Sequence, residues 1–361
     1  MTTLAETEDL FDEQKAEAFG GHMVAILNYG ALNIPISLGH QTGLFDAMAE
    51  LPPSTSEEIA AAAGLDERYV REWLGAMVTG KIVEYDGETK RYVLPPEHAP
   101  FVSRAGGVDN LAFFTQYLAL IGNVERRLVD AFRNGGGVAY EHYPDFQRLQ
   151  AEETARVFDA KLVGTILPLV PGLVERLGEG IQVADVGCGA GHAINVMAKA
   201  FPKSSFTGYD FSSDGIALGR AEARKVGLEN ARFELRDVAT LEAEGAYDLV
   251  TAFDAIHDQV RPREVLRRIA RALRPGGLFL MADMKASSDL AKNVDHPFGP
   301  LLFTYSVAHC MTVSLAHGGE GLGAMWGEEK ALELLREAGF TTVDVREIEG
   351  DPLNSYYIAR R

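Results

Sequence analysis

A glycine-rich turn is the segment of this sequence whose residue types and spacing point most directly to chemistry. In residues 183–192, Val-Ala-Asp-Val-Gly-Cys-Gly-Ala-Gly-His, a β-branched run ends at Asp185, and glycines follow at alternate positions: Gly187, Gly189 and Gly191. Glycine lets the backbone pass close to a ligand, and a helix that begins after such a turn offers free N–H groups to a negative group. The spacing differs from the Gly-x-Gly-x-x-Gly of dinucleotide-binding folds. The segment predicts a ligand site, with Cys188 and His192 as further contact residues.

Acidic residues close the strands that we expect next along the chain. Asp210 ends residues 206–210, 23 positions after Gly187, where a carboxylate can accept hydrogen bonds from both hydroxyls of a ribose. Asp237 follows residues 232–236, where a carboxylate can accept from an adenine amino group. The alternatives are a tight strand-to-helix turn for the glycines and a solvated loop acid for Asp237.

His257 is the residue that could move a proton. It lies in Asp-Ala-Ile-His-Asp, residues 254–258, just after an expected strand at 247–253. A neutral imidazole can accept a proton near neutral pH, and a phenol, whose pKa is about 10, reacts faster with such a base. The alternative is that His257 only shapes a pocket or completes a strand end. Asp254, Asp258 and Asp283 do not have the spacing of a magnesium site, so we predict no metal.

An apolar insertion lies between Asp283 and an expected helix at 328–338. It is a candidate lid and ligand pocket, because pockets are mostly apolar with few polar groups; the alternative is an ordinary core helix followed by a glycine-rich loop. Its aromatic, sulfur and histidine residues are His296, Phe298, Phe303, Tyr305, His309, Cys310, Met311, His317, Met325 and Trp326. His309 and Cys310 suggest a nucleophilic pair, but adjacent helical residues face different ways, so we do not expect them to act together.

The elements that must position these residues begin at Ile181. From there, short β-branched runs alternate with amphipathic helical stretches, a pattern typical of a parallel sheet covered by helices. Strands are expected near residues 181–186, 205–209, 231–235, 247–253, 277–283, 341–348 and 354–360. Helices are expected near residues 191–200, 213–226, 262–273 and 328–338.

The N-terminal part reads differently. An acidic leader runs to about Glu17, and an apolar helical stretch follows over 19–51, with a break expected near Pro35. Capping signals then predict two helices, the first beginning at Ser54 or Thr55 and the second at Asp66. Turn signals predict a β-hairpin over 81–94, and two helices followed by such a hairpin are typical of a winged helix. Residues 40–100 hold five basic and eleven acidic side chains, a sum of −6, whereas a DNA-binding module needs a basic face.

Composition sets the class. The chain has 361 residues, 47% hydrophobic and 24% charged, which fits a globular protein with a substantial core. Its net charge is −18, which repels nucleic acid and anionic membranes. Two cysteines without a paired motif argue against disulfides and a thiolate zinc site, and we see neither an export signal nor a bilayer-spanning stretch. We expect a cytoplasmic protein whose partner is a small molecule, with neither nucleic acid nor membrane as a partner.

Taken in order, the motifs from about residue 165 to residue 361 resemble those of the class I S-adenosylmethionine-dependent methyltransferases. The resemblance includes Leu-Arg-Pro-Gly-Gly at 273–277, and the N-terminal half resembles the winged-helix dimerisation domain of bacterial, including mycobacterial, small-molecule enzymes of that class. It implies an α/β fold with a Rossmann-like, seven-stranded sheet whose last strand is antiparallel, and an N-terminal, mostly helical winged-helix domain. It also implies a homodimer. We expect domains at residues 1–165 and 166–361.

The same resemblance implies roles for particular residues toward S-adenosylmethionine. Asp185 and the glycine turn would hold the methionine end, Asp210, with Phe211 beside it, the ribose, and Asp237 and Val238 the adenine. Phe253 and Asp254 would line the sulfonium side, and His22 and Tyr29 would line the pocket from the N-terminal helix, unless they pack in a core.

His257 matches the general base of plant-type O-methyltransferases, although Gln259 stands where that family has tryptophan. We therefore expect O-methylation of a small aromatic or apolar acceptor. The alternatives are N-, S- or C-methylation, or a ligand-sensing transcriptional regulator that kept the fold.

Overall fold

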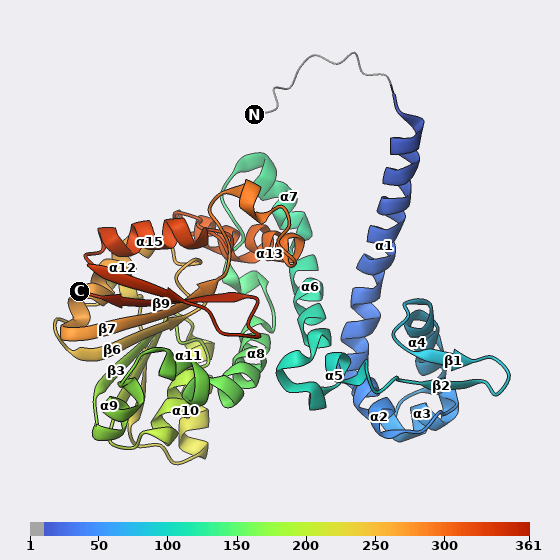
Figure 1. Ribbon diagram of the computed structural model, residues 1–361, viewed down its shortest axis with the longest axis horizontal. Coiled ribbons are helices and arrows are strands. Elements are labelled where there is room, and N and C mark those ends of the chain that lie inside the picture. The colour runs from blue at the N-terminus through green and yellow to red at the C-terminus, as the bar shows by residue number, and fades with distance from the viewer. Residues whose placement is uncertain (1–10) are drawn as a thin grey trace. The chain divides into compact units, whose positions relative to one another are not determined.

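The computed structural model describes residues 11–361, so the first ten residues of the acidic leader lie outside the described residues. The chain divides into two compact units, one ending at Ala119 and one running from Leu120 to Arg361 (Figure 1). Each is described below by itself.

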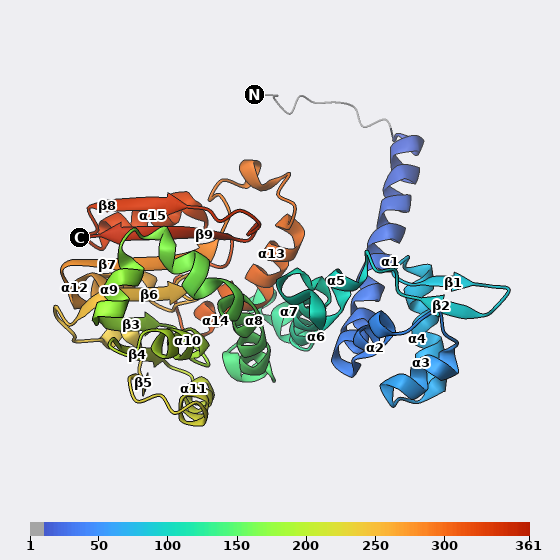
Figure 2. The same ribbon diagram turned by 60° about the horizontal axis from the view of Figure 1, so that its bottom comes forward.

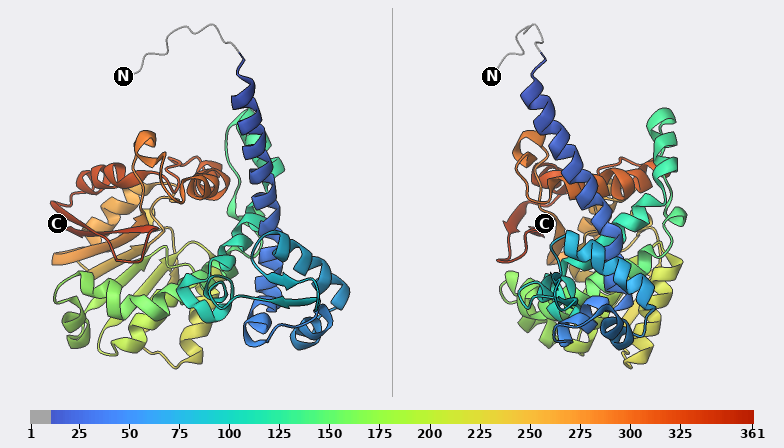
Figure 3. Two further views of the ribbon diagram at one scale, coloured as in Figure 1. Left: turned by 45° about the vertical axis from the view of Figure 1, so that its right-hand side comes forward. Right: turned by 90° about the vertical axis from the view of Figure 1, so that its right-hand side faces the viewer.

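The N-terminal unit is built on a long helix, α1 (Glu13–Thr42), drawn in blue in Figure 3. Contrary to the expected break, α1 continues through Pro35 and ends where Gly43 adopts a left-handed conformation, φ 75°. The Pro35 carbonyl accepts a hydrogen bond from the Trp73 indole at 2.7 Å, which ties this part of α1 to the core of the unit. The unit also contains α2 (Leu44–Glu50), α5 (Ala99–Val102) and most of α6 (Thr115–Gly122).

The winged-helix prediction is confirmed in this unit. Helix α3 (Ser56–Ala63) begins with a capping box between Thr55 and Glu58, and α4 (Glu67–Thr79) is capped by Asp66. The wing is the antiparallel pair β1 (Glu84–Asp86) and β2 (Arg91–Val93). Leu74 and Met77 of α4 are fully buried against α2 and α3, so the apolar face of α4 forms the core of the unit.

The C-terminal unit contains the expected seven-stranded sheet. Its strands, in the spatial order β5-β4-β3-β6-β7-β9-β8, are β5 (Ala231–Leu235), β4 (Ser205–Asp210), β3 (Gln182–Val186), β6 (Tyr247–Phe253), β7 (Leu273–Met284), β9 (Asn354–Arg360) and β8 (Thr342–Arg346). The first five are parallel, and β9 is antiparallel to both of its neighbours. The chain order reverses between β3 and β6, the position at which such sheets bind ligands at the carboxyl ends of their strands.

Helices cover both faces of this sheet (Figure 2). One face packs against α8 (Phe146–Lys161), α9 (Leu173–Glu179), α10 (His192–Ala200) and α11 (Ser213–Lys225). The other packs against α12 (Pro262–Ala272) and α15 (Gly327–Glu337). The insertion after β7 contains α13 (Gly299–Tyr305), the π-helical turn η8 (Ser306–Cys310) and α14 (Met311–Ala316).

The segment before α8 packs with the sheet unit, although we expected the division between units near residue 165. Helix α7 (Glu125–Asn134) leads through three glycines into a stretch that we call the strap, residues 138–146. The Val138 N–H donates to the Thr312 hydroxyl at 2.9 Å, and the Tyr143 hydroxyl donates to the Ala308 carbonyl at 2.6 Å. Both acceptors belong to the insertion after β7, so the strap and the insertion form one layer.

Over residues 11–361, no single helix is long and apolar enough to cross a membrane, and one sharply bent pair, Phe146–Leu169 with Leu173–Glu179, passes that test only when taken together.

Candidate functional site

The glycine turn connects β3 to α10 and lies against the neighbouring strands. Gly187, Gly189 and Gly191 all have positive φ, between 52° and 69°, a region that disfavours other residues. A side chain at Gly191 would place Cβ 2.1 Å from the Phe233 ring. The turn therefore needs glycine for its backbone conformation at all three positions and, at Gly191, for space as well.

Two buried carboxylates face this turn. Asp210, at the end of β4, accepts from the Gly189 N–H at 2.8 Å and from the Ser212 N–H at 2.7 Å. Asp185 accepts from the Thr251 hydroxyl at 2.6 Å. Burial raises the pKa of Asp185 to about 7, against the opposing hydrogen bond from Thr251, and burial also raises the pKa of Asp210. Ionising these two carboxyl groups is thus costly in the free protein, and they are suited to a ligand that brings hydrogen-bond donors or positive charge.

The other residues proposed for the adenosine side lie at the same edge of the sheet. Asp237 accepts from the Ala239 N–H at 2.8 Å and pairs with Arg261 at 2.6 Å, so an adenine amino group would share this carboxylate with both. Val238 is buried beside it. Phe211 is 52% exposed and packs edge-on against Tyr140 of the strap, with ring centroids 5.3 Å apart.

The side chains of Cys188 and His192 both have partners within the protein, Cys188 in the Gly189 carbonyl at 3.9 Å. The His192 ring pairs with Glu222 at 2.8 Å and with Asp159 at 3.0 Å, so at this position the residue offers its backbone and not its ring. Burial raises the pKa of the Cys188 thiol well above its usual value, and the charges of Asp185 and Asp210 add to the effect. Their roles as ligand contacts stay predictions.

Phe253 and Asp254 end β6. The Phe253 ring packs on the Phe158 ring of α8, with ring centroids 5.0 Å apart. Asp254 adopts a left-handed conformation, φ 51°, which is uncommon for a residue other than glycine. Burial and the nearby Asp283 charge raise the pKa of Asp254 well above its usual value. Within the described chain, the Asp254 Oδ1 atom is buried without a hydrogen-bond partner. Strain and an unsatisfied oxygen in one residue are typical of a functional position.

His257 is held by a carboxylate on the next strand. Its Nδ1 lies 2.8 Å from Asp283 Oδ1, and both side chains are almost fully buried. Because a carboxylate accepts, Nδ1 donates, and Nε2 is left for other partners. Burial alone would lower the pKa of His257, but the Asp283 charge and hydrogen bonds to Asp283 and Cys310 raise it well above its usual value. The result is a pre-oriented imidazole of raised basicity.

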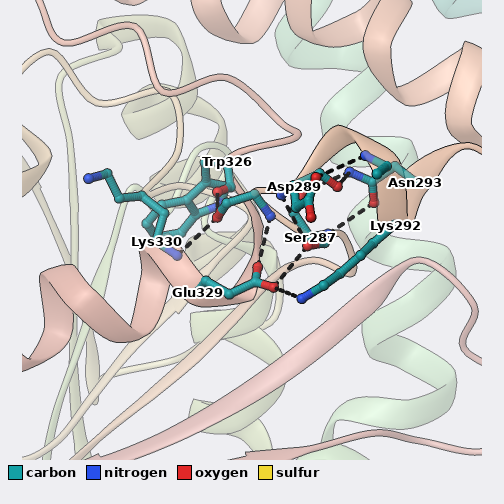
Figure 4. Close-up of polar contacts among 9 residues, drawn as sticks. Ser287, Asp289, Lys292, Asn293, Trp326, Glu329 and Lys330 are labelled. Atoms are coloured by element: carbon teal, nitrogen blue, oxygen red, sulfur yellow. Dashed lines mark hydrogen bonds and ion pairs between the residues drawn. The ribbon is translucent and has the colours of Figure 1, made fainter. Parts of the chain in front are cut away.

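Asp283 is in turn held by the insertion and by α15. Its Oδ1 also accepts from the Trp326 indole and from the Met284 N–H, each at 2.9 Å. Trp326 is anchored through Ser288, which donates to the Trp326 carbonyl at 2.6 Å and whose N–H donates to Glu329 at 2.8 Å. Figure 4 shows Trp326 and Glu329 within this network. The same network includes Ser287, Asp289, Lys292, Asn293 and Lys330.

The strap brings further polar groups to the site that the motifs had not indicated. Tyr140 donates to Asp258, the neighbour of His257, and burial raises the pKa of Asp258 to about 6. Gln147, at the start of α8, places its Oε1 3.3 Å from where a Cβ on Gly215 would lie. That Oε1 is buried and, among the described residues, has no hydrogen-bond partner, as expected of an atom that meets a ligand. Only the recurrence of an aromatic residue at every third position over 140–146 could have suggested this segment.

Two predicted residues lie in the other unit. His22 and Tyr29 are both on α1 and both exposed, Tyr29 at 72%. The alternative that they pack in a core of their own unit does not hold, and their part in the site stays a prediction. Over residues 11–361, no group of three or more His, Cys, Asp or Glu side chains is arranged to hold a metal ion.

Comparisons with known proteins agree with this geometry. Residues 30–104 match the Rv2258c-like winged helix-turn-helix domain, and residues 177–339 match a methyltransferase domain family. Fatty-acid O-methyltransferase of Mycolicibacterium smegmatis is 34% identical over 112 residues, which are 31% of this chain and 40% of that protein. Malonyl-[acyl-carrier protein] O-methyltransferase of Bacillus cereus is 27% identical over 161 residues, 44% of this chain and 53% of that one. The chain thus spans about half, or less, of the length of these relatives.

Solved structures resemble nearly the whole chain. Mitomycin 7-O-methyltransferase has a TM-score of 0.70 at 17% identity, covering 97% of this chain and all of that one. Human N-acetylserotonin methyltransferase, crystallised with S-adenosylmethionine, has a TM-score of 0.64 at 17% identity and covers 99% of both chains. At this identity the likeness concerns the fold. Together with the two domain matches, it shows a winged helix-turn-helix domain followed by a methyltransferase domain.

Proposed function

We propose that this chain transfers a methyl group from S-adenosylmethionine to an oxygen of a small aromatic or apolar acceptor, with His257 as the general base. The observation that carries the proposal is the His257–Asp283 pair, buried at the carboxyl edge of β6 and β7 in the same sheet as the glycine turn. The runner-up, methylation of nitrogen, sulfur or carbon, uses the same binding groups without needing the base.

The residues present fit the cofactor. The glycine turn has no space for a Cβ at Gly187 or Gly191. Among the described residues, Gln147 and Asp254 each offer a buried oxygen without a partner, and the carboxylates of Asp185 and Asp210 suit a cationic ligand with hydroxyl groups. When bound, the cofactor supplies an electrophilic methyl group on a sulfonium. We assign Asp185 and the glycine turn to its amino-acid end and Asp210 to its ribose.

The chain's own contribution is orientation and proton transfer. Asp283 fixes the His257 ring through Nδ1, so Nε2 is the atom that would take the acceptor proton. Trp326 and the Met284 N–H fix Asp283 in turn. The strap and the insertion meet in a cluster of rings, with Tyr140 and Tyr143 packed edge-on against His309, and such an apolar surface would suit an apolar acceptor.

Calorimetric titration with S-adenosylhomocysteine tests the cofactor half of the proposal. We expect binding by the wild type and its loss in Asp210→Ala, whereas Asp295→Ala, an exposed control in the same unit, should bind normally. A folded wild type that binds nothing would contradict the proposal. It would favour the regulator alternative, which a salt-dependent mobility shift on DNA would then have to support against the −6 charge of residues 40–100.

His257→Ala tests the base and separates the methylated atoms. An O-methyltransferase should lose roughly 10²–10⁴-fold in rate while still binding S-adenosylhomocysteine, whereas an enzyme that methylates a thiolate should lose little.

We further propose a homodimer, supported by the exposed apolar residues of α1, among them Ile26, Leu27 and Tyr29. Light scattering of the pure protein tests it. The cytoplasmic location remains a proposal that rests on the sequence.

A further inference from the structure

Three donors meet on one oxygen of Asp283. Its Oδ1 accepts from His257 Nδ1 at 2.8 Å and from the Trp326 indole and the Met284 N–H at 2.9 Å each. Its Oδ2 is buried and, among residues 11–361, has no hydrogen-bond partner. A carboxylate oxygen offers about two lone-pair positions, so the three donors on Oδ1 have to share them. The indole therefore competes with His257 for the oxygen that orients the imidazole.

This competition bears on whether His257 can act as a base. Burial lowers the pKa of His257, but the Asp283 charge outweighs it and holds this pKa well above its usual value. The groups that act electrostatically on the ring are Asp283 from β7, Asp254 and Asp258 after β6, and His309 and Cys310 from η8. An imidazole that is already protonated cannot accept another proton, so a base in these surroundings needs a group that opposes the pull of Asp283.

The Trp326 indole is placed to oppose it. A hydrogen bond to a carboxylate is strong when the charge is otherwise unbalanced, and it is weaker when an adjacent imidazolium already offsets that charge. The indole therefore stabilises the neutral form of His257 more than the protonated form. A buried indole needs some acceptor in any case, but here it uses the same oxygen that holds the imidazole, and this couples the two groups.

The backbone around Trp326 holds the indole in place. Ser288 donates to the Trp326 carbonyl at 2.6 Å, and the Lys330 N–H donates to the Ser288 hydroxyl at 3.1 Å. At Gly327, the next residue, φ is 79° and a Cβ would lie 2.1 Å from the Ser288 nitrogen, so glycine is needed for the conformation and for the close approach. The Trp326 side chain is 5% exposed. The indole thus has little freedom to leave Asp283.

We infer that Trp326 is a positioning residue for His257: its indole holds Asp283 Oδ1 and takes up part of its charge, so that the imidazole gives up its proton near neutral pH. Trp326 acts through Asp283 and takes no proton itself. The inference rests on the proposed function for its consequence, which is a general base that is neutral when the acceptor binds.

The test compares Trp326→Phe with Trp73→Phe, which removes the other indole of the chain, one that donates to a backbone carbonyl in the N-terminal unit. The titration of His257 is followed by NMR of isotope-labelled histidine in the full chain without ligand, and His257→Gln identifies the signal. We expect the pKa of His257 to rise by about half to one unit in Trp326→Phe and to stay unchanged in Trp73→Phe. The acid limb of the pH–rate profile should move up by the same amount.

A second pair of variants keeps the indole and loosens its anchor. Ser288→Ala removes the hydrogen bond to the Trp326 carbonyl, and Ser287→Ala is the matched control, because the Ser287 hydroxyl donates to Glu329 instead. We expect a smaller rise in the pKa of His257 in Ser288→Ala and none in Ser287→Ala. If melting curves show that Trp326→Phe is unfolded, this second pair decides.

An unmoved or lowered pKa of His257 in the folded test variant, or an equal rise in its control, would overturn the inference. The titration needs no methyl transfer, so it separates the two ideas. A rise in a protein that methylates nothing would support the role of Trp326 while the proposed function failed, and an unmoved pKa in an active enzyme would do the reverse.

Discussion

Replacing Asp185 by asparagine should stabilise the cofactor-free protein while removing its binding function. Asp185 is 3% exposed, and burial raises its pKa from 3.8 to about 7. A carboxyl group whose folded pKa is raised contributes stability below its unfolded pKa, and that contribution is lost as the pH rises through the folded pKa. The loss is complete above about pH 7. This burden is the amount by which the ionised Asp185 lowers the free energy of unfolding. At 1.36 kcal/mol for each pKa unit, it is at most about 4 kcal/mol.

Asparagine removes this burden and keeps the local geometry. Its Oδ1 can still accept from the Thr251 hydroxyl, now 2.6 Å from Asp185 Oδ1. Asp185→Asn should therefore gain up to about 4 kcal/mol over the wild type at pH 8, a rise in melting temperature on the order of 10 °C for a unit of this size. Near pH 4 the gain should vanish.

The assay is denaturant and thermal unfolding of both proteins without ligand, between pH 4 and pH 8. Exposed Asp295→Asn serves as a control and should show no such pH-dependent difference. The variant should also lose S-adenosylhomocysteine binding in the calorimeter. A variant less stable than the wild type at pH 8, or a difference independent of pH, would refute the argument that a buried carboxylate is held here at a cost to the fold.

Three further predictions concern the base, the turn and the N-terminal unit. Asp283→Asn should move the acid limb of the pH–rate profile to lower pH and lower its plateau, because the Asp283 charge raises the pKa of His257; an unmoved limb would argue against the pair. Gly191→Ala should abolish S-adenosylhomocysteine binding and lower the melting temperature, since its Cβ would lie 2.1 Å from the Phe233 ring; normal binding would contradict the tight turn. Trp73→Phe should cost about 1 kcal/mol in denaturant unfolding by removing its hydrogen bond to α1, and no loss would show that this bond is unimportant.

Most of the sheet could be predicted because its signals are local. Each strand is a short run that contains β-branched or aromatic residues, and all seven lie within a few residues of the expected ranges, except that β7 begins at Leu273. The predicted break at Pro35 was wrong because tertiary packing overrides the tendency of proline to interrupt a helix. The Trp73 indole donates to the Pro35 carbonyl and holds the helix on the core of its unit.

The site residues likewise divide into those that the sequence could predict and those that it could not. The glycine turn and Asp210 follow from sequence spacing, because they lie at adjacent strand ends. The partner of His257 does not, since Asp283 is 26 residues away and becomes its neighbour only because β7 lies beside β6. Contacts made by long insertions carry no periodic signal.

The buried acids explain why this pocket needs its ligand. Asp185, Asp254 and Asp258 all have raised pKa values, chiefly through burial, and Asp254 and Asp283 each keep a buried oxygen that lacks a partner in the described structure. Burying such groups without partners costs free energy. On the proposed function, a sulfonium ligand with amino and hydroxyl groups would satisfy several of them at once, so the features that destabilise the free site would favour the cationic cofactor over its product, which lacks the sulfonium charge. The arrangement therefore predicts both tight substrate binding and easier release after methyl transfer, when the positive charge is gone.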